Sequence, residues 1–281
     1  MGHDVGLLAA IPSPSSGSIE ILGVRLNAYG LMIALGVIVA VRIAGRRAGA
    51  RGVTDADGFA AVAMWGVPAG VIGGRAYHVV TSTESFRGRW VEALYVWQGG
   101  LGIWGGILCG VLAGLWKARR MGLDPLAVLS CAAPAIAVAQ AIGRWGNWFN
   151  QELFGRPTDL PWALSVSDAT AIKAGYPAGT TFHPTFLYES LGCLLIAWVL
   201  VLIERKRDPA PGRLFALYVM LYTAMRFFIE GLRVDPARGA GGLRLNQWVS
   251  IAVFTAAGLL VLADRRRSRG ATQGSTVDDH E

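Results

Sequence analysis

The sequence has few charged residues for its length. Only 16% of its 281 residues are charged and 53% are hydrophobic, whereas soluble domains average about a quarter charged. The mean hydropathy is positive, at +0.43. Length alone is compatible with one or two soluble domains, but this shortage of charge favours a polytopic membrane protein.

Cysteine is also scarce, which excludes two common kinds of site. The three cysteines, Cys109, Cys131 and Cys193, lie far apart inside apolar runs, and none belongs to a CxxC pair. A disulfide framework and a cysteine metal site both need closer or paired spacing. We therefore interpret all three as small buried hydrophobic residues.

Basic residues outnumber acidic ones, and their distribution indicates a membrane rather than nucleic acid. The formal net charge is +7, but the basic residues form short clusters between apolar runs. Such clusters are typical of the cytoplasmic loops of membrane proteins. We expect membrane lipids to be partners and expect no nucleic-acid partner.

Seven apolar segments are candidates for membrane-spanning helices, since a bilayer core needs roughly 20 apolar residues of helix. The predicted fold class is therefore an all-α polytopic membrane protein with about seven transmembrane helices. The segments cover residues 26–45, 57–80, 99–118, 125–146, 185–204, 212–232 and 245–263.

The loops between these segments predict an orientation. Basic clusters at 46–51, 117–120, 205–213 and 265–269 fall in alternate loops, which places the N-terminus outside and the C-terminus in the cytoplasm. The stretch 147–184 is then one longer outer loop, with a short strand expected around residues 162–166. We expect a single membrane-embedded catalytic domain over residues 1–269 and a disordered cytoplasmic tail over 270–281.

Arginines inside the expected spans suggest a function, because a charge at mid-bilayer costs about 2.5–3.5 kcal/mol on insertion scales. Arg144 ends the fourth span in GRWGNWFNQELFG, residues 143–155. Tyr222, Arg226, Glu230 and Arg233 are spaced four, four and three residues apart, which aligns them on one helical face. On the predicted orientation this stripe runs toward the same outer leaflet as Arg144.

Two interpretations of these charges are open. An internal ladder of ion pairs needs no ligand. However, Arg144, Arg226 and Arg233 exceed Glu152 and Glu230 by one positive charge. An excess positive charge near the outer leaflet favours a phospholipid phosphate, which guanidinium binds in a bidentate way.

Two further motifs have a structural and a functional interpretation. Gly102, Gly106, Gly110 and Gly114 recur every four residues, which predicts close helix packing. Gly99 and Gly100 before them are candidates to offer backbone amides to a ligand. In HPTFLYES, residues 183–190, His183 stands just before Pro184 at a helix start, as a cap or as a neutral base. Glu189, deeper in the same helix, is a candidate partner for an arginine.

Several of these motifs resemble one known family. GRWGNWFNQELFG closely resembles the signature of the prolipoprotein diacylglyceryl transferases, bacterial inner-membrane enzymes. NAYGLMIALG, WQGGLGIWGG, HPTFLYES and YTAMRFFIEGLRVD are similar to further motifs of that family, in the same order over residues 20–263. The resemblance therefore covers nearly the whole chain.

The resemblance implies an activity. It implies transfer of the diacylglyceryl group from phosphatidylglycerol to the lipobox cysteine thiol of a prolipoprotein signal peptide. The products are a thioether and glycerol 1-phosphate, and no metal or soluble cofactor is needed. The implied location is the bacterial inner membrane, with the site toward the outer leaflet.

The resemblance also implies site residues. The family positions fall here on Tyr29, Arg144, Asn147, Glu152, Gly155, Tyr222, Arg226, Glu230 and Arg233. We expect Arg144 and Arg226 to bind the phosphate, Arg233 to orient Glu230 or the glycerol, and Asn147 to bind the head group. Gly155 is expected to permit a tight turn.

One departure from the family concerns the base. Many members have a histidine in the third-span glycine motif, where this chain has Trp104. The candidates that remain are His183 and Glu152, and we favour His183 because the other histidine is missing.

Two rival functions differ in class. A phospholipid transporter or flippase would use the same arginines, but we find no inverted repeat. A metal-dependent lipid phosphotransferase would need a carboxylate cluster, which the predicted cytoplasmic face lacks.

Overall fold

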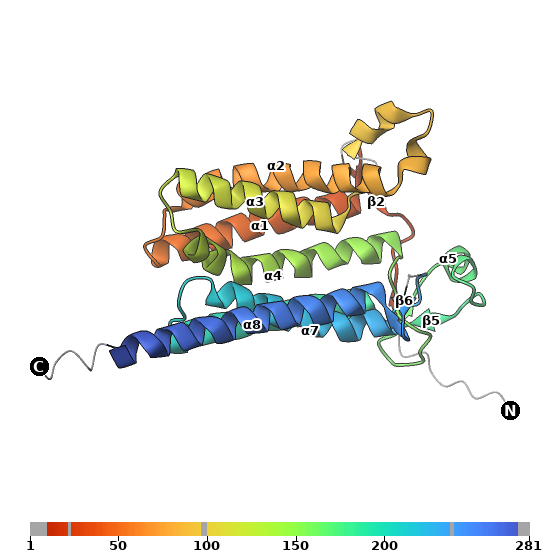
Figure 1. Cartoon of the computed structure of the whole chain (residues 1–281). Helices are drawn as coiled ribbons and strands as arrows, with labels where there is room; N and C mark the ends of the chain where they lie inside the picture. Colours follow the sequence, from red (N-terminus) through yellow and green to blue (C-terminus); the bar gives the residue numbers. More distant parts are fainter. Residues whose placement is uncertain (1–9, 22–23, 97–99, 237–238, 275–281) are drawn as a thin grey trace, which may run out of the picture. The chain divides into compact units, whose positions relative to one another are not determined.

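The computed structural model describes residues 10–21, 24–96, 100–236 and 239–274, which are mostly helical (Figure 1). The chain divides into two compact units. One contains Met1–Gly36 and Ile136–Glu281, and the other contains Val37–Ala135. Helices α1 and α4 contribute residues to both units.

All seven apolar segments predicted from the sequence are helical. The corresponding helices are α1 (Ala28–Ala50), α2 (Ala56–Thr81), α3 (Ile103–Arg120), α4 (Pro125–Asn150), α6 (Thr185–Arg207), α7 (Arg213–Leu232) and α8 (Leu245–Gly274). Six of them are long and apolar enough to cross a membrane. Helix α3 is the exception, since it has 18 residues and carries Lys117, Arg119 and Arg120 in its last turn. The predicted all-α polytopic class is confirmed, and the orientation stays a prediction.

Helix α8 is longer than predicted. It continues from the expected end at residue 263 to Gly274 and so overlaps the first residues of the tail expected to be disordered. Arginine, which occurs four times in residues 264–274, is a good helix former even without an apolar face. Residues 275–281 lie outside the described part of the chain.

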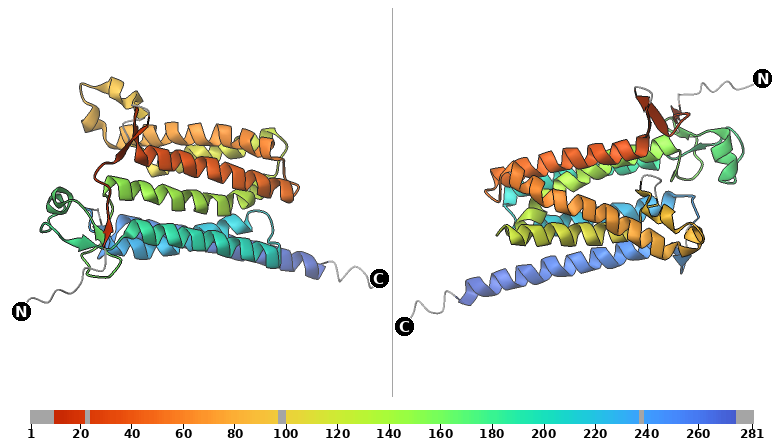
Figure 2. Two further views of the ribbon diagram at one scale, coloured as in Figure 1. Left: turned by 180° about the vertical axis from the view of Figure 1, so that it is seen from behind. Right: turned by 90° about the horizontal axis from the view of Figure 1, so that it is seen from above.

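In the unit Val37–Ala135, helices α2 and α3 pack on each other through glycines (Figure 2). A Cβ on Gly70 would lie 3.2 Å from the carbonyl oxygen of Gly106, and one on Gly66 equally close to that of Gly110. The amide of Gly102 donates to the carbonyl of Gly74 at 2.7 Å. The glycine repeat therefore serves close packing, as one of its two interpretations predicted.

In the other unit, helix α7 packs against both α6 and α8 (Figure 1). A small head of irregular structure follows α4. It holds β4 (Leu164–Ser165), α5 (Asp168–Lys173) and β5 (Thr181–Phe182), and β4 pairs with β5 and with the N-terminal β1 (Ile11–Pro12) (Figure 2). Strand β4 is the short strand expected around residues 162–166.

The head has its own apolar core. Phe154, Leu164, Phe182 and Phe186 are buried together, and the rings of Phe154 and Phe182 lie 4.5 Å apart. Because Phe186 belongs to the first turn of α6, this core attaches the head to the helix that carries Glu189.

Several other short elements were not predicted. They are the hairpins β2 (Ser18–Ile21) with β3 (Val24–Asn27) and β6 (Gly239–Ala240) with β7 (Leu243–Arg244), and the turns η1 (Thr83–Phe86) and η2 (Trp90–Leu94). Segments of two to five residues contain too little periodicity for a sequence pattern to identify.

Candidate active site

Three helices of the unit Met1–Gly36 with Ile136–Glu281 bring the predicted arginines together around two buried glutamates. Arg144 comes from α4, Glu189 from α6, and Arg226 with Glu230 from α7. Glu189 is 3% exposed and Glu230 is 0% exposed. A buried carboxylate needs a paired cation, and each of these two has more than one.

Glu189 connects two arginines from different helices. Its Oε2 lies 2.6 Å from Nε of Arg144, and its Oε1 lies 2.9 Å from Nη1 of Arg226. The sequence suggested only that Glu189 pairs with an arginine, and the structure shows that it bridges both predicted phosphate ligands. It was absent from the predicted catalytic set because spacing along one helix cannot reveal a partner on another.

Glu230 is held in a similar way by α7 and the segment after it. Arg226 uses Nη2 for an ion pair with Glu230, and Arg233 Nη1 lies 3.4 Å from the same carboxylate. Arg244 Nε lies 2.9 Å from Oε1 of Glu230, and Asn246 donates to that oxygen at 3.2 Å. The predicted stripe on α7 exists, but Arg244 and Asn246 join it from β7 and α8.

Asp235, outside the apolar helices, completes the cluster. It binds Arg233 at 2.7 Å and Arg244 at 2.9 Å. Partial burial opposes ionisation, but the hydrogen bond and charge of Arg233 and the charge of Arg244 outweigh it. The net result is that the pKa of Asp235 lies below its ordinary value.

The excess of one positive charge predicted from the sequence persists with different members. Within the described residues, the ion-paired cluster contains four arginines and three carboxylates. They are Arg144, Arg226, Arg233 and Arg244 with Glu189, Glu230 and Asp235. Glu152, which the prediction counted, instead accepts hydrogen bonds from the amides of Asn147 at 2.8 Å and Asn150 at 3.3 Å.

Arg144 is the arginine whose terminal nitrogens are held least tightly. Its Nε is engaged by Glu189, while Nη1 lies 3.4 Å from Oδ1 of Asn147 and Nη2 lies 3.4 Å from the hydroxyl of Tyr222. Both Nη contacts are at the long limit for hydrogen bonds. The side chain is 18% exposed, so the guanidinium edge can exchange these contacts for a stronger acceptor.

Asn147 and Tyr29 lie beside this edge. Asn147 belongs to the last turn of α4 and is 3% exposed. Tyr29, in the first turn of α1, interacts with the side chain of Asn147 and is close to Arg144 and Glu152. Its ring lies against Gly146, where a Cβ would come within 2.5 Å of Tyr29 Cδ2. Gly146 thus lets Tyr29 reach the site.

Gly155 is required for a reason other than the predicted one. Its backbone forms a bridge with Arg233, and its amide donates to the carbonyl of His183 at 2.9 Å. A Cβ there would lie 2.8 Å from that of His183. The tight turn is instead made by Gln151 and Leu153, which have φ of 52° and 60°. Gly155 permits a close approach of chains rather than a turn.

His183 is oriented by neighbours in the head and in α6. Its Nδ1 lies 3.1 Å from the hydroxyl of Tyr188, which also accepts a hydrogen bond from Trp162 Nε1 at 2.9 Å. The bond with Tyr188 is the hydrogen bond that the His183 ring makes among the described residues. The fold brings His183 next to Gly155, and its imidazole is engaged with Tyr188 rather than with the ion-paired cluster.

Two glycines, Gly99 and Gly100, were expected to offer amides to a ligand. Gly99 lies outside the described residues. Gly100 belongs to the unit Val37–Ala135, has φ of 70°, and accepts a hydrogen bond from Arg75 Nη1 at 3.2 Å. Arg75 also donates to the carbonyl of Ala93 at 2.8 Å, so this in-span arginine connects α2 to η2 and to Gly100.

Two tryptophans of the signature pack as an aromatic group at the end of α4. The rings of Trp145 and Trp148 lie 5.7 Å apart, and Trp145 also contacts Phe186 at 5.4 Å. Trp148 donates from Nε1 to the carbonyl of Pro12 at 3.1 Å. The aromatics therefore attach the end of α4 to α6 and to the N-terminal segment.

No group of three or more histidine, cysteine, aspartate or glutamate side chains suited to a metal ion occurs within the described ranges. The charged groups of the cluster are the guanidinium groups of arginines and the carboxylates paired with them. Several guanidinium groups around a partly exposed Arg144 suit an anion with bidentate oxygens, such as a phosphate.

Comparison with known proteins agrees with this chemistry. The sequence profile of the family "Prolipoprotein diacylglyceryl transferase" matches residues 17–263. A phosphatidylglycerol–prolipoprotein diacylglyceryl transferase of Streptomyces griseus is 49% identical over 250 residues, covering 88% of this chain and 75% of the relative. The enzyme so named from Frankia alni is 46% identical, with 92% and 69% covered.

A third relative, of the same name and from Cutibacterium acnes, is 44% identical over 275 residues, which cover 97% of this chain and 92% of the relative. The family profile and these relatives both extend over most of the chain, including the helices that carry the arginine cluster. The chain belongs to the prolipoprotein diacylglyceryl transferase family.

Proposed function

We propose that this protein transfers the diacylglyceryl group of phosphatidylglycerol to the lipobox cysteine thiol of a prolipoprotein signal peptide. The thiolate attacks the glyceryl carbon that carries the phosphate, a C–S bond forms, and the C–O bond to phosphate breaks. Glycerol 1-phosphate leaves with the bonding electron pair, and the thiol proton goes to a base. Membership of the family supports this activity.

The observation that carries the proposal is the geometry of Arg144. Glu189 holds its Nε, and both Nη atoms have contacts of only 3.4 Å. A phosphate that approaches this edge accepts two hydrogen bonds between opposite charges. They replace two long hydrogen bonds from the guanidinium to neutral oxygens. As the C–O bond breaks, the phosphate gains negative charge, so Arg144 stabilises the transition state more than the bound lipid.

We assign Arg226 a supporting role rather than the direct phosphate contact expected from the sequence. Both of its Nη atoms are engaged, one by Glu189 and the other by Glu230. We assign it a supporting positive charge near the phosphate and the task of aligning the two glutamates. We assign Arg233, which contacts Glu230, to orienting that carboxylate. This is one of the two roles expected for it from the sequence.

The polar residues at the end of α4 suit the glycerol part of the head group. Asn147 lies between Arg144 and Glu152, and Tyr29 and Tyr222 add hydroxyls on either side. We assign these groups to hydrogen bonds with the head group. Gly155 keeps Arg233 and His183 in register through its backbone.

A base must take the thiol proton, because a thiol with a pKa near 8.5 is a weak nucleophile at neutral pH. We assign this role to His183, with Glu152 as the alternative. Oε1 of Glu152 already accepts hydrogen bonds from the amides of Asn147 and Asn150. Among the described residues His183 has one ring hydrogen bond, between Nδ1 and Tyr188, and we assign its Nε2 to the thiol proton.

The location proposed is the bacterial inner membrane, with the cluster toward the outer leaflet. Six helices long and apolar enough to cross a membrane support a multi-pass protein, and the relatives named above are bacterial. The alternation of basic loops supports the orientation. The transporter alternative gains nothing from the relatives, whose names are those of transferases.

The test uses purified protein in detergent with phosphatidylglycerol and a synthetic lipobox peptide, followed by mass spectrometry. We expect a peptide heavier by one diacylglyceryl group and the release of glycerol 1-phosphate. A peptide with serine in place of cysteine should stay unmodified. Binding of phosphatidylglycerol without any transfer to the cysteine peptide would contradict the proposal and favour lipid transport.

A further inference from the structure

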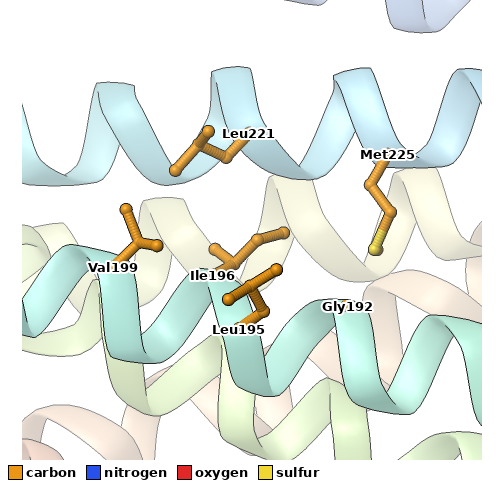
Figure 3. Close-up of a pocket in the computed structure, with 6 residues that line it drawn as sticks. All are labelled: Gly192, Leu195, Ile196, Val199, Leu221 and Met225. Carbon is orange, nitrogen blue, oxygen red and sulfur yellow. The ribbon is translucent and has the colours of Figure 1, made fainter.

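An apolar groove lies between α6 and α7, below the charged cluster. Figure 3 shows its six lining residues, with Gly192 and Met225 at one end and Val199 at the other. The cavity volume is about 170 Å³. The lining residues, all without charge, are Gly192, Leu195, Ile196, Val199, Leu221 and Met225.

One position that lines the groove, Gly192, has no side chain. A Cβ on Gly192 would overlap Sδ of Met225, so only glycine allows Met225 to lie there. Leu195, on the groove wall, is 57% exposed, which means that the groove is open to its surroundings. In a membrane, these surroundings are lipid rather than water.

One end of the groove adjoins the residues that we assign to the phosphate. On α6, Glu189 and the lining residue Gly192 are three residues apart and so share a face of the helix, and Glu189 is paired with Arg226 of α7. Gly192 lies about one helical turn beyond Glu189 along α6. From there the groove follows α6 away from the cluster to Val199, over about 10 Å. A phospholipid has the same order of parts, with a phosphate followed by an acyl chain.

The size of the groove selects between apolar occupants. An α-helix with its side chains is about 10–12 Å across. The groove, with a volume of about 170 Å³, cannot enclose even one turn of such a helix. An apolar protein cavity of roughly 150 Å³ is enough for a molecule of six carbons. A segment of a single acyl chain therefore fits, and the helical core of a signal peptide does not.

We propose that the groove between α6 and α7 binds one acyl chain of the phosphatidylglycerol whose phosphate contacts Arg144. This inference rests on the proposed function, because that function supplies the lipid. The groove holds the chain segment next to the glycerol, and the thioether-forming carbon is thereby positioned between the arginines and the incoming thiol.

Transfer kinetics with two lipids test the groove. Val199→Phe fills its far end, and Leu194→Phe is the matched control, since Leu194 lies on the same helix, is 45% exposed and does not line the groove. Val199→Phe should raise KM for dipalmitoyl phosphatidylglycerol at least about fourfold, the effect of one methylene left unburied. KM for a dibutyryl lipid, whose chains are too short to reach Val199, should change much less, and Leu194→Phe should affect neither.

A second readout does not need turnover. Phosphatidylglycerol with a diazirine in the middle of an acyl chain is irradiated with the intact protein, and labelled peptides are identified by mass spectrometry. We expect labels on Leu195, Val199 or Leu221, suppressed by excess unlabelled lipid and reduced by Val199→Phe. Labels spread over other exposed apolar residues, or insensitive to the competitor, would mean ordinary boundary lipid and would overturn the proposal.

The outcomes separate this inference from the proposed function. If the unchanged protein labels in the groove but modifies no peptide, the groove stands as a lipid site and the transferase assignment fails. If the protein modifies the peptide but Val199→Phe shifts both lipids equally, or raises KM for the peptide instead, the acyl-chain groove is wrong.

Discussion

Glu189 Oε2 lies 2.6 Å from Nε of Arg144, and the glutamate side chain is only 4% exposed. The other oxygen of the same carboxylate lies 2.9 Å from Arg226. One buried carboxylate therefore sets the orientation of both arginines that the sequence assigned to a phosphate. While Nε of Arg144 is engaged by this carboxylate, the two Nη atoms keep only their 3.4 Å contacts with Asn147 and Tyr222.

Glu189→Gln should therefore damage both stability and activity. Removing the charge leaves Arg144 and Arg226 less compensated, and breaking a buried ion pair costs about 3–5 kcal/mol. We expect a lower thermal unfolding midpoint in detergent and at least about a tenfold loss of kcat. The control is Glu84→Gln, since Glu84 pairs with Arg87 on the surface, with side chains 75% and 72% exposed. Equal behaviour of the two variants would contradict the bridging role.

Arg144→Lys should separate a bidentate contact from a simple positive charge. Lysine retains the charge but not the planar pair of Nη donors. We expect kcat to fall about 10²–10³-fold, as for removal of one transition-state donor, with a smaller change in KM. Arg156→Lys is the control, because Arg156 is exposed and donates to the carbonyl of Gly231 at 2.9 Å. Full activity of Arg144→Lys would assign the phosphate to another residue.

The base can be identified by comparing His183→Ala with Glu152→Gln. If His183 is the base, its loss should lower kcat about 10²–10⁴-fold and leave lipid binding unchanged. Glu152→Gln should mainly raise KM, because the amide of Asn147 then donates to a neutral oxygen and is held less firmly. Steady-state kinetics with the peptide assay distinguish the two parameters. The opposite pattern, with kcat lost only in Glu152→Gln, would transfer the role to Glu152.

Asp235 should make stability depend on pH in the acid range. Its pKa is below the ordinary value because Arg233 and Arg244 outweigh the effect of partial burial. Its ionised form thus stabilises the folded protein fully above the ordinary carboxyl pKa, and this contribution is lost as pH falls toward the lowered value. Unfolding midpoints measured between pH 7 and pH 3 should fall less in Asp235→Asn than in the unchanged protein. Parallel curves would contradict the ion pair.

The contact of α2 with α3 should tolerate no side chain at Gly73. A Cβ there would lie 2.4 Å from that of Cys109 and 2.5 Å from the carbonyl of Gly105. Gly73→Val should lower the unfolding midpoint, because overpacking reduces the free energy of unfolding by about 1–3 kcal/mol. Gly49→Ala, with its nearest neighbour 3.9 Å away, should be neutral or slightly stabilising. Equal midpoints for the two variants would mean that α2 and α3 do not pack through this glycine.

The sequence by itself determined the helices and pointed to several residues of the ion-paired cluster. Apolar runs of about 20 residues fold as helices whatever their neighbours, because the bilayer requires every backbone group to be paired within the segment. The spacing of Tyr222, Arg226 and Glu230 ensures that they share a face of α7. The family signature located Tyr29 and Gly155, which charge alone does not reveal.

Only the tertiary structure decided how those residues are connected. Glu189 and Arg244 entered the cluster from α6 and β7, and Glu152 was found with two asparagines rather than with an arginine. The reason is physical: helical periodicity constrains neighbours within one helix, whereas an ion pair between helices depends on which faces the packing brings together. The groove beside Gly192 has the same origin, since its lining residues come from two helices, α6 and α7.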